Sequence, residues 1–561
     1  MSHSKRQKTA EAALVDQTDF LSDSRLLIVF GAMALTFFIT YADQNGIAVS
    51  LPAMARELDA QNTISWAGTS SFIGNTVFQV LYGRMSDILG RKVVYLSAVT
   101  LLAVADILCA TAHSGPALYV FRGLSGVAIG GINSLTMMIV SDIVSLERRG
   151  NYQGMLGGMI GMGNIAGPFI SAAFTQHAHT WRGFFYFISP TTLLCGIVAF
   201  FLIPYKKGTQ KGSEAVKLID WAGLFTACVA IIFFLVPISG GGSYFAWSSA
   251  MVVTMLAISL ASAIAFVLVE WKVAMLPLMP LTMFKTPAVA AILAQNFLFG
   301  CAYYSELYYL PIYFQNVRGW TPIASSALLV PFVLAQAIFS IASGFYISRY
   351  KRYGEVLWIG FTCWTAGAGS MCAFDRDTPI YGIILTGAIT GIGVGNVFQP
   401  CLIAIQAHSP KTQRAVVISN RNFLRALGGA IGLAVSAQVL QTTLKESLPD
   451  GLRHIASSAY ARPNLDDFDE SDKEIIKSAY MTACRMVFVS LAPFMGVCLL
   501  GCLLIKDRGL QRKEELEAAD NIRPEQATEN LVPGPDTAAS RTASTHNEKA
   551  NTEDLAVVEK C

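Results

Sequence analysis

Residues 154–172 read GMLGGMIGMGNIAGPFISA, a stretch apolar enough for a lipid bilayer but interrupted by glycine at almost every third or fourth position. In water such a helix would be poor, because each interior glycine costs roughly 1 kcal/mol relative to alanine and an interior proline about 3 kcal/mol. In a membrane it is tolerated, because neighbouring helices satisfy the freed backbone groups and small residues let two helices approach closely. The stretch predicts either a tightly packed membrane helix or a helix that bends as the protein changes conformation.

The composition of the whole chain is that of a membrane protein. Of its 561 residues, 53% are hydrophobic and only 14% are charged, whereas soluble proteins contain roughly 25% charged residues. Apolar runs of about 20 residues, the length that crosses the hydrocarbon core, occur about fourteen times. We therefore expect an all-α membrane protein with about 14 transmembrane helices.

Lysine and arginine residues gather in the short loops of one predicted side. Cytoplasmic loops of membrane proteins carry such an excess, so both termini are expected in the cytoplasm. The expected location is a multi-pass protein of the plasma membrane, with the vacuolar membrane as the alternative. The net charge of +3 is small and does not indicate nucleic-acid binding.

Two parts of the chain share a sequence pattern. The glycine-rich segment at 122–133, followed by a basic loop and a second glycine-rich helix, is echoed by the segment at 387–396. Secondary transporters are often built from such repeats, with the binding site between them. The predicted organisation is an N-terminal cytoplasmic tail at 1–24, a six-helix half at 25–205, two additional linking helices at 206–273, a second six-helix half at 274–506 with an extracellular or lumenal loop at 441–478, and a disordered cytoplasmic tail at 507–561.

The segment at 83–92 reads GRMSDILGRK and is expected to join two membrane helices. Gly90 suits a tight turn, and Asp87 can cap a helix or pair with an arginine as two halves close. In place and spacing the segment resembles the loop signature of the major facilitator superfamily, a fold of two pseudo-symmetric six-helix halves. The resemblance implies conformational roles for Gly83, Asp87, Gly90 and Arg91.

Other segments resemble the fourteen-helix drug:proton antiporters of this superfamily, over about residues 25–506. The segment at 43–52 is similar to their first-helix signature, and Arg122 with Gly126 to their fourth. The opening stretch is similar to their fifth, although serine and alanine at 171–172 replace a pair of glycines. The resemblance implies a fungal-type efflux transporter, not an enzyme, that exports drugs, toxins or secondary metabolites in exchange for protons. The matching positions of the fifth signature are Gly154, Gly163, Gly167 and Pro168.

Two charged side chains of the first half are candidates for proton coupling. A charge at the centre of a membrane helix costs about 2.5–3.5 kcal/mol on insertion scales, so Asp43 is a functional candidate. We interpret Asp43 as a proton-binding carboxylate; the alternative is a structural ion pair. The resemblance implies that Arg122 takes part in the proton relay, and the alternative is a helix-locking pair with Asp43 or Asp106.

Aromatic residues at 303–309 surround Glu306. They predict a cavity that binds small amphipathic or cationic organic molecules through burial and cation–π attraction; the alternative is an aromatic belt at the membrane interface. Arg421 and Arg425, one helical turn apart, are open to two interpretations, an anion-favouring wall or an anchor at a helix end, and we favour the anchor. The predicted substrate-binding residues are Glu306, Tyr303, Gln295, Phe299, Tyr309 and Asn133.

The sequence has no phosphate-binding loop and no histidine or cysteine cluster with metal spacing, so energy is expected from an ion gradient and no cofactor or metal is predicted. The expected partners are small amphipathic organic substrates, protons and the lipid bilayer, with no nucleic acid, and a monomer is expected. The alternatives are an exporter of one fungal metabolite, a vacuolar basic amino-acid or siderophore transporter, a non-transporting nutrient sensor and a channel.

Overall fold

The computed structural model describes residues 7, 21–60, 63–64, 66–177, 180–205, 219–241, 245–452, 469–507 and 509–510. All of them belong to one compact unit, which spans Met1–Arg512. Most of the predicted disordered tail at 507–561 and most of the predicted tail at 1–24 lie outside the described residues.

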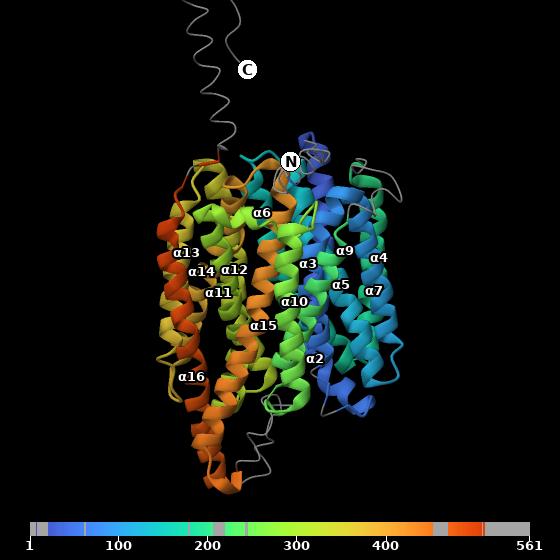
Figure 1. Cartoon of the computed structure of the whole chain (residues 1–561). Helices are drawn as coiled ribbons and strands as arrows, with labels where there is room; N and C mark the ends of the chain where they lie inside the picture. The colour runs from blue at the N-terminus through green and yellow to red at the C-terminus, as the bar shows by residue number, and fades with distance from the viewer. Residues whose placement is uncertain are drawn as a thin grey trace, which may run out of the picture. The chain divides into compact units, whose positions relative to one another are not determined.

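The described chain is built from fourteen long α-helices (Figure 1). Eleven of the described helices are long and apolar enough to cross a membrane by length and composition; α3, α6 and α13 are less apolar. The prediction of an all-α fold with about 14 helices is confirmed. The helices are α2 (Asp23–Glu57), α3 (Trp66–Leu89), α4 (Arg91–Ala110), α5 (Gly115–Ile143), α6 (Arg149–His177), α7 (Arg182–Leu202), α9 (Trp221–Gly240), α10 (Ala250–Lys272), α11 (Pro287–Ile312), α12 (Pro322–Tyr350), α13 (Gly354–Met371), α14 (Ile380–Ala407), α15 (Arg414–Ser447) and α16 (Glu470–Gly501). Short helical segments lie at Leu281–Lys285, Tyr313–Val317, Lys411–Gln413 and Cys502–Leu504.

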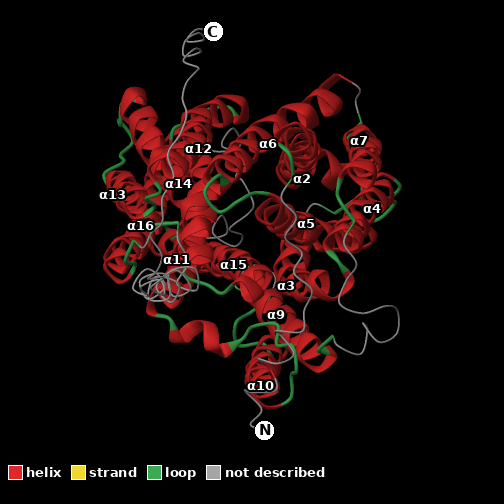
Figure 2. Ribbon diagram, turned by 90° about the horizontal axis from the view of Figure 1, so that it is seen from above, coloured by secondary structure: helices red, strands yellow, loops and turns green. Residues whose placement is uncertain are grey.

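The helices form two six-helix halves with the same internal packing. In the first half α2 packs against α6, α3 against α5, and α4 against α7; in the second half α11 packs against α15, α12 against α14, and α13 against α16. The remaining pair, α9 and α10, pack on each other, and α9 lies against α3 and α15 (Figure 2). The predicted arrangement of six, two and six helices is confirmed.

The two halves meet along α6 with α12 and along α3 with α15. We call the end of the bundle that holds Asp23, Gly90, Arg149 and Arg414 the basic end, after its arginine-rich loops, and the opposite end the far end. At the far end, α15 and α16 extend into the predicted loop at 441–478 (Figure 1). The reason is length, because the 34 residues of α15 span about 51 Å at 1.5 Å per residue, more than the ~30 Å hydrocarbon core.

The glycine-rich stretch forms most of α6, which packs against both halves. A Cβ atom on Gly154 would lie 2.6 Å from the Ser340 carbonyl oxygen of α12, and one on Gly167 would lie 2.3 Å from the Ala42 carbonyl oxygen of α2. Real Cβ atoms do not approach other atoms so closely, so only glycine permits these backbone contacts. The helix continues through Pro168 to its end at His177. α6 is therefore a tightly packed helix. Its N-terminal part, at Gly154, contacts α12 of the second half, and its C-terminal part, at Gly167, contacts α2.

We predict that Gly167→Leu and Gly163→Leu destabilise the protein, because each new side chain would meet the backbone of α2, at Ala42 or at Phe38. Overpacking costs about 1–3 kcal/mol or more. The measurement is the unfolding temperature of the detergent-purified protein, together with its amount in the membrane fraction, which should be maintained. Gly31→Leu is the matched control, since nothing lies within 4 Å of a Cβ atom there. Equal unfolding temperatures for all three variants would contradict the packing role.

Candidate functional site

Three charged side chains of the first half meet in its interior. Arg122 of α5 donates from Nη1 to both carboxylate oxygens of Asp43 on α2, at 3.1 Å each. The same nitrogen lies 3.9 Å from Oδ1 of Asp106 on α4, which also accepts a 3.3 Å hydrogen bond from Ser125 Oγ. All four side chains are fully buried. We call Asp43, Asp106 and Arg122 the charge cluster.

Close helix packing holds the charge cluster in place. One turn after Arg122, a Cβ atom on Gly126 would lie 2.0 Å from the Ser71 carbonyl oxygen, so glycine lets α5 touch α3. On the other side, the ring of Phe185 on α7 lies 5.7 Å from the Arg122 guanidinium. An arginine held between an aromatic ring and two carboxylates has a fixed orientation.

The charge cluster contains two carboxylates and one guanidinium. When both carboxylates are ionised it carries one uncompensated negative charge, and the Asp106 Oδ2 atom has no hydrogen-bond partner within the described chain. An uncompensated buried charge costs several kcal/mol, and a single proton neutralises the group. The Asp43–Arg122 ion pair that the sequence raised as an alternative exists, and the chemistry of the cluster is suited to binding one proton. Proton binding at Asp43 stays a prediction.

Glu306 lies in an aromatic environment within the second half. Its two carboxylate oxygens accept hydrogen bonds of 3.2 and 3.1 Å from Nε1 of Trp364 on α13. The rings of Phe299 and Tyr303 lie 5.7 and 6.5 Å from the Trp364 ring. Glu306 is buried, and in the described helices no cationic side chain lies within 4 Å of it. The structure thus brings together three of the predicted substrate residues, Glu306, Phe299 and Tyr303, and adds Trp364. The sequence signal for Trp364 was a tryptophan inside an apolar run, because the N–H of a buried tryptophan needs a hydrogen-bond partner.

The other predicted substrate residues lie apart from this group. Gln295 donates a 2.7 Å hydrogen bond to the Cys498 carbonyl oxygen of α16, and Tyr309 donates one of 3.4 Å to the Leu433 carbonyl oxygen of α15. Asn133 is buried in α5 of the first half, and its Oδ1 atom has no partner among the described residues. Gln295 and Tyr309 therefore join helices of the second half.

A chain of polar side chains crosses from one half to the other. Asn45 of α2 donates to Asn164 of α6 at 2.8 Å, Asn164 donates to the Tyr303 hydroxyl of α11 at 3.4 Å, and Tyr303 donates to Gln336 of α12 at 3.3 Å. Asn45, Asn164 and Gln336 were not predicted from the sequence as functional residues. The available signal was an amide side chain inside an apolar run, as at position 164 of the glycine-rich stretch.

Arg421 and Arg425 are buried in the interior of α15, not at its end. Arg421 donates to the Phe398 carbonyl oxygen and, at 2.9 Å, to Oδ1 of Asn422. The Arg425 guanidinium lies 4.8 Å from the Phe398 ring. Nε of both arginines and Nη1 of Arg425 lack hydrogen-bond partners in the described part of the chain. Two buried cations thus lie one helical turn apart, and some of their N–H groups have no acceptor among the described residues.

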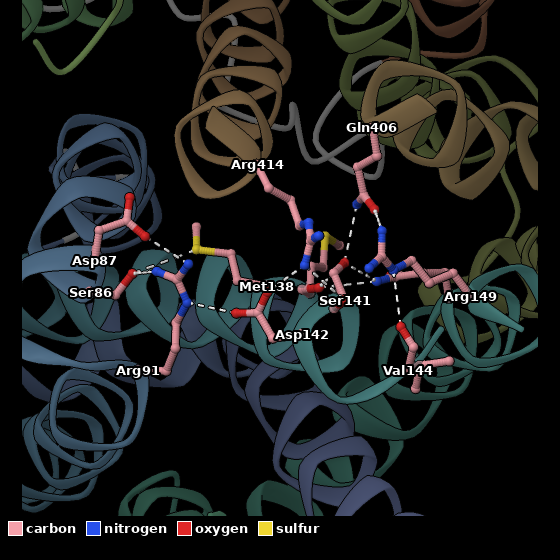
Figure 3. Close-up of polar contacts among 12 residues, drawn as sticks. Ser86, Asp87, Arg91, Met138, Ser141, Asp142, Val144, Arg149, Gln406 and Arg414 are labelled. Atoms are coloured by element: carbon pink, nitrogen blue, oxygen red, sulfur yellow. Dashed lines mark hydrogen bonds and ion pairs between the residues drawn. The ribbon is translucent and has the colours of Figure 1, made fainter. Parts of the chain in front are cut away.

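At the basic end, Asp142 ties the two halves together (Figure 3). This carboxylate at the end of α5 accepts from Arg91 Nε of α4 at 2.9 Å and from Arg414 Nη1 of α15, in the other half, at 2.8 Å. Arg91 also pairs with Asp87 at 2.7 Å and donates to Ser86. We call the group Asp87, Arg91, Asp142 and Arg414 the latch.

Other contacts close the same end around the latch. Arg149 of α6 donates to Gln406 of α14 at 3.2 Å, and Gln406 donates to Ser141 at 3.2 Å (Figure 3). A Cβ atom on Gly83 would lie 2.4 Å from Ser419 Oγ of α15. Gly90, before α4, has φ +95°, a conformation that favours glycine. Within the segment at 83–92 only Gly90 lies outside α3 and α4, so the expected connection is a turn at this one residue, and Gly83 of α3 packs against the opposite half. Asp142 and Gln406 are partners that were not predicted from the sequence.

Comparisons with known proteins agree with this architecture. Residues 33–433 match the family described as "Major Facilitator Superfamily". The chain is 47% identical over 517 residues to "Citrate exporter 1" of Yarrowia lipolytica, covering 91% of this chain and 76% of that protein. It is 39% identical over 502 residues to "MFS-type transporter clz4" of Cochliobolus lunatus, covering 89% of each protein.

A solved structure with the same fold is that of the human organic anion transporter MFSD10 (TETRAN), with a TM-score of 0.56 and 14% sequence identity. The alignment covers 86% of this chain and 99% of that one. At this identity the likeness concerns the fold alone. The family match, the relatives and the fold confirm the resemblance found in the sequence. The chain belongs to the major facilitator superfamily, as a transporter of the fungal type.

Proposed function

We propose that this protein exports small organic compounds across a membrane in exchange for protons. The observation that carries the proposal is the charge cluster, which holds two buried carboxylates against one guanidinium in the first half. Such a group becomes neutral on binding one proton, which is what a proton-coupled carrier needs within the bilayer. The similarity to a citrate exporter supports export as the direction of transport.

In the proposed cycle the basic end faces the cytoplasm, in keeping with the excess of positive residues in its loops. Asp43 takes up a proton when the far end is open, and Arg122 helps to release it inward when the latch opens. Substrate occupies the region between the halves near Glu306 and Tyr303. The protein acts as a monomer in the plasma membrane, or alternatively in the vacuolar membrane.

The latch stabilises one state of this cycle. Asp142 is shared between an arginine of its own half and Arg414 of the other half, and these side chains are at least nine-tenths buried. Removing one partner of a buried ion pair costs about 3–5 kcal/mol, because the other charge remains buried. The latch therefore favours the state that is closed at the basic end, and it must break before substrate can enter from that side.

We predict that Asp43→Asn abolishes proton-driven export, because the remaining carboxylate and Arg122 form a neutral pair that no longer takes up a proton. The measurement is uptake of radiolabelled citrate, and of a fluorescent organic cation, into inside-out vesicles with an imposed pH gradient. Exchange of substrate without a gradient should continue, since it needs no proton transfer.

The control for this variant is Asp23→Asn, which removes an exposed carboxylate paired with Arg148 at the protein surface. Exposed pairs contribute about 0–1 kcal/mol, so its export should equal that of the wild type. Gradient-driven export by Asp43→Asn at the wild-type rate would rule out the proposed coupling site.

We predict that Arg414→Gln opens the basic end. The reporter is Ser419→Cys, because Ser419 is fully buried against Gly83, in a background with the native cysteines replaced. Labelling by a membrane-impermeant maleimide from the basic end should become at least several-fold faster in Arg414→Gln. Arg148→Gln, which breaks only the exposed pair with Asp23, should leave the rate unchanged. An unchanged rate in Arg414→Gln would show that the latch does not hold this end closed.

A further inference from the structure

The two arginines in the interior of α15 differ in their surroundings from three other buried arginines of the bundle. Arg91, Arg122 and Arg414 each lie within 4 Å of a carboxylate. Within the described part of the chain, Arg421 and Arg425 have no carboxylate within that distance, although their exposed fractions are 0% and 2%. Burying one unpaired ion costs several kcal/mol, and here two lie one helical turn apart.

The groups that face these arginines are neutral. The Tyr41 hydroxyl of α2 and the Tyr304 hydroxyl of α11 lie near Arg425, and the Cys401 thiol of α14 lies near Arg421. The Phe398 ring covers one face of the Arg425 guanidinium at 4.8 Å. No described neighbour carries a carboxylate that would compensate the positive charge of the two guanidinium groups.

The arginine pair lies where the two halves meet. A Cβ atom on Gly300, near the middle of α11, would lie 2.2 Å from the Arg425 carbonyl oxygen, so Arg425 is at mid-helix depth. The neighbouring Asn422 donates to Met137 Sδ of α5, in the other half, at 3.6 Å. Asn133, one turn from Met137 on α5, has a buried Oδ1 without a described partner. Polar atoms without a described hydrogen-bond partner therefore occur on α5 of the first half, at Asn133, and on α15 of the second half, at Arg421 and Arg425.

We propose that Arg421 and Arg425 form a binding site for a small organic anion that carries at least two carboxylates. Guanidinium groups bind carboxylates through paired, charge-assisted hydrogen bonds, and two guanidinium groups match two carboxylates in number and in charge. The inference rests on the proposed function, because such an anion would be the exported substrate. It replaces the anchoring role favoured from the sequence, since an anchor lies at a helix end and has solvent or phosphate for a partner.

The position of the site fits loading from the basic end. Arg414 of the latch and Arg421 lie on the same helix, two turns apart. Both guanidinium groups of the site are shielded while the latch is closed, and breaking the latch frees the end of α15 that leads to them. An anion then reaches the site from the side that the latch had covered.

The first experiment is equilibrium binding of radiolabelled citrate to the detergent-purified full-length protein at pH 7, without any gradient. Unlabelled succinate should displace citrate, whereas lactate, inorganic phosphate and tetraphenylphosphonium should do so only weakly. Arg421→Gln and Arg425→Gln should each weaken citrate binding roughly 10- to 100-fold, the value of hydrogen bonds to a charged group. The lysine variants should lie between glutamine and wild type, because lysine keeps the charge but not the paired donors.

The second readout separates binding from a structural role. Without ligand, the two glutamine variants should unfold at the wild-type temperature or above it, because an unpaired buried charge has been removed. An anchor predicts the opposite, a lower unfolding temperature. Arg485→Gln is the matched control, because this arginine of α16 donates to the Phe374 carbonyl oxygen away from the site; its citrate affinity should be unchanged.

Several outcomes would overturn the proposal. These are absence of citrate binding to the wild type, wild-type affinity in both glutamine variants, displacement by inorganic phosphate as potent as by succinate, or weakened binding together with a lowered unfolding temperature. Because binding is measured without a gradient, it is distinguishable from the coupling mechanism. Loss of binding in Arg425→Gln would support the site even if gradient-driven export of the wild type failed.

Discussion

The need to compensate buried charges governs the arrangement of the helices around the charge cluster and the latch. α5 shows this most directly, because it carries Arg122 in one part and Asp142 in its last turn. The first is compensated by Asp43 and approached by Asp106; the second is shared by two arginines, one of them from the other half. Twenty residues separate the two charges, about 30 Å along a helix. One rigid element thus connects the candidate proton site with the closure of the basic end.

Close backbone contacts complement the ion pairs. α6 touches α12 of the second half near Gly154 and touches α2 near Gly167, close to Asp43. Because Gly167 has no side chain, the backbone of α6 lies directly against the backbone of α2, and a movement of α2 relative to α6 would bring these backbone atoms into collision. The amide chain from Asn45 through Asn164 to Tyr303 joins the same helices to α11. α2 therefore carries Asp43 of the charge cluster and is connected to the second half through Asn164 of α6. A connection of this kind is what coupling between a proton and a conformational change requires.

Much of the fold could be predicted from the sequence, because each membrane helix corresponds to a long apolar run of residues. Short loops join these runs one after another along the chain. The charge cluster was partly predictable, since an aspartate and an arginine inside apolar runs have few possible partners. The partners of Glu306 and Asp142 were not, because Trp364 and Arg414 lie far away in the sequence and helix periodicity shows which residues share a face but not which helix that face meets. Gln295 illustrates the limit: it was predicted to bind substrate together with Glu306, yet it donates to a carbonyl oxygen of α16.

The two halves repeat the same packing but use their buried charges differently. α2 and α11 take equivalent places, and each carries a buried carboxylate, Asp43 and Glu306. Asp43 faces a guanidinium, so its ionised form is compensated and its protonated form adds no charge beyond that of Arg122 and Asp106. Glu306 faces only the Trp364 N–H among the described residues, so its ionised form would be uncompensated at a cost of several kcal/mol. A carboxylate that binds and releases protons repeatedly needs a low free energy in the membrane interior for both its ionised and its protonated form. That condition supports our proposal that the first half carries the proton. It also agrees with the proposed anion site at Arg421 and Arg425 of α15, which have no carboxylate within 4 Å among the described residues.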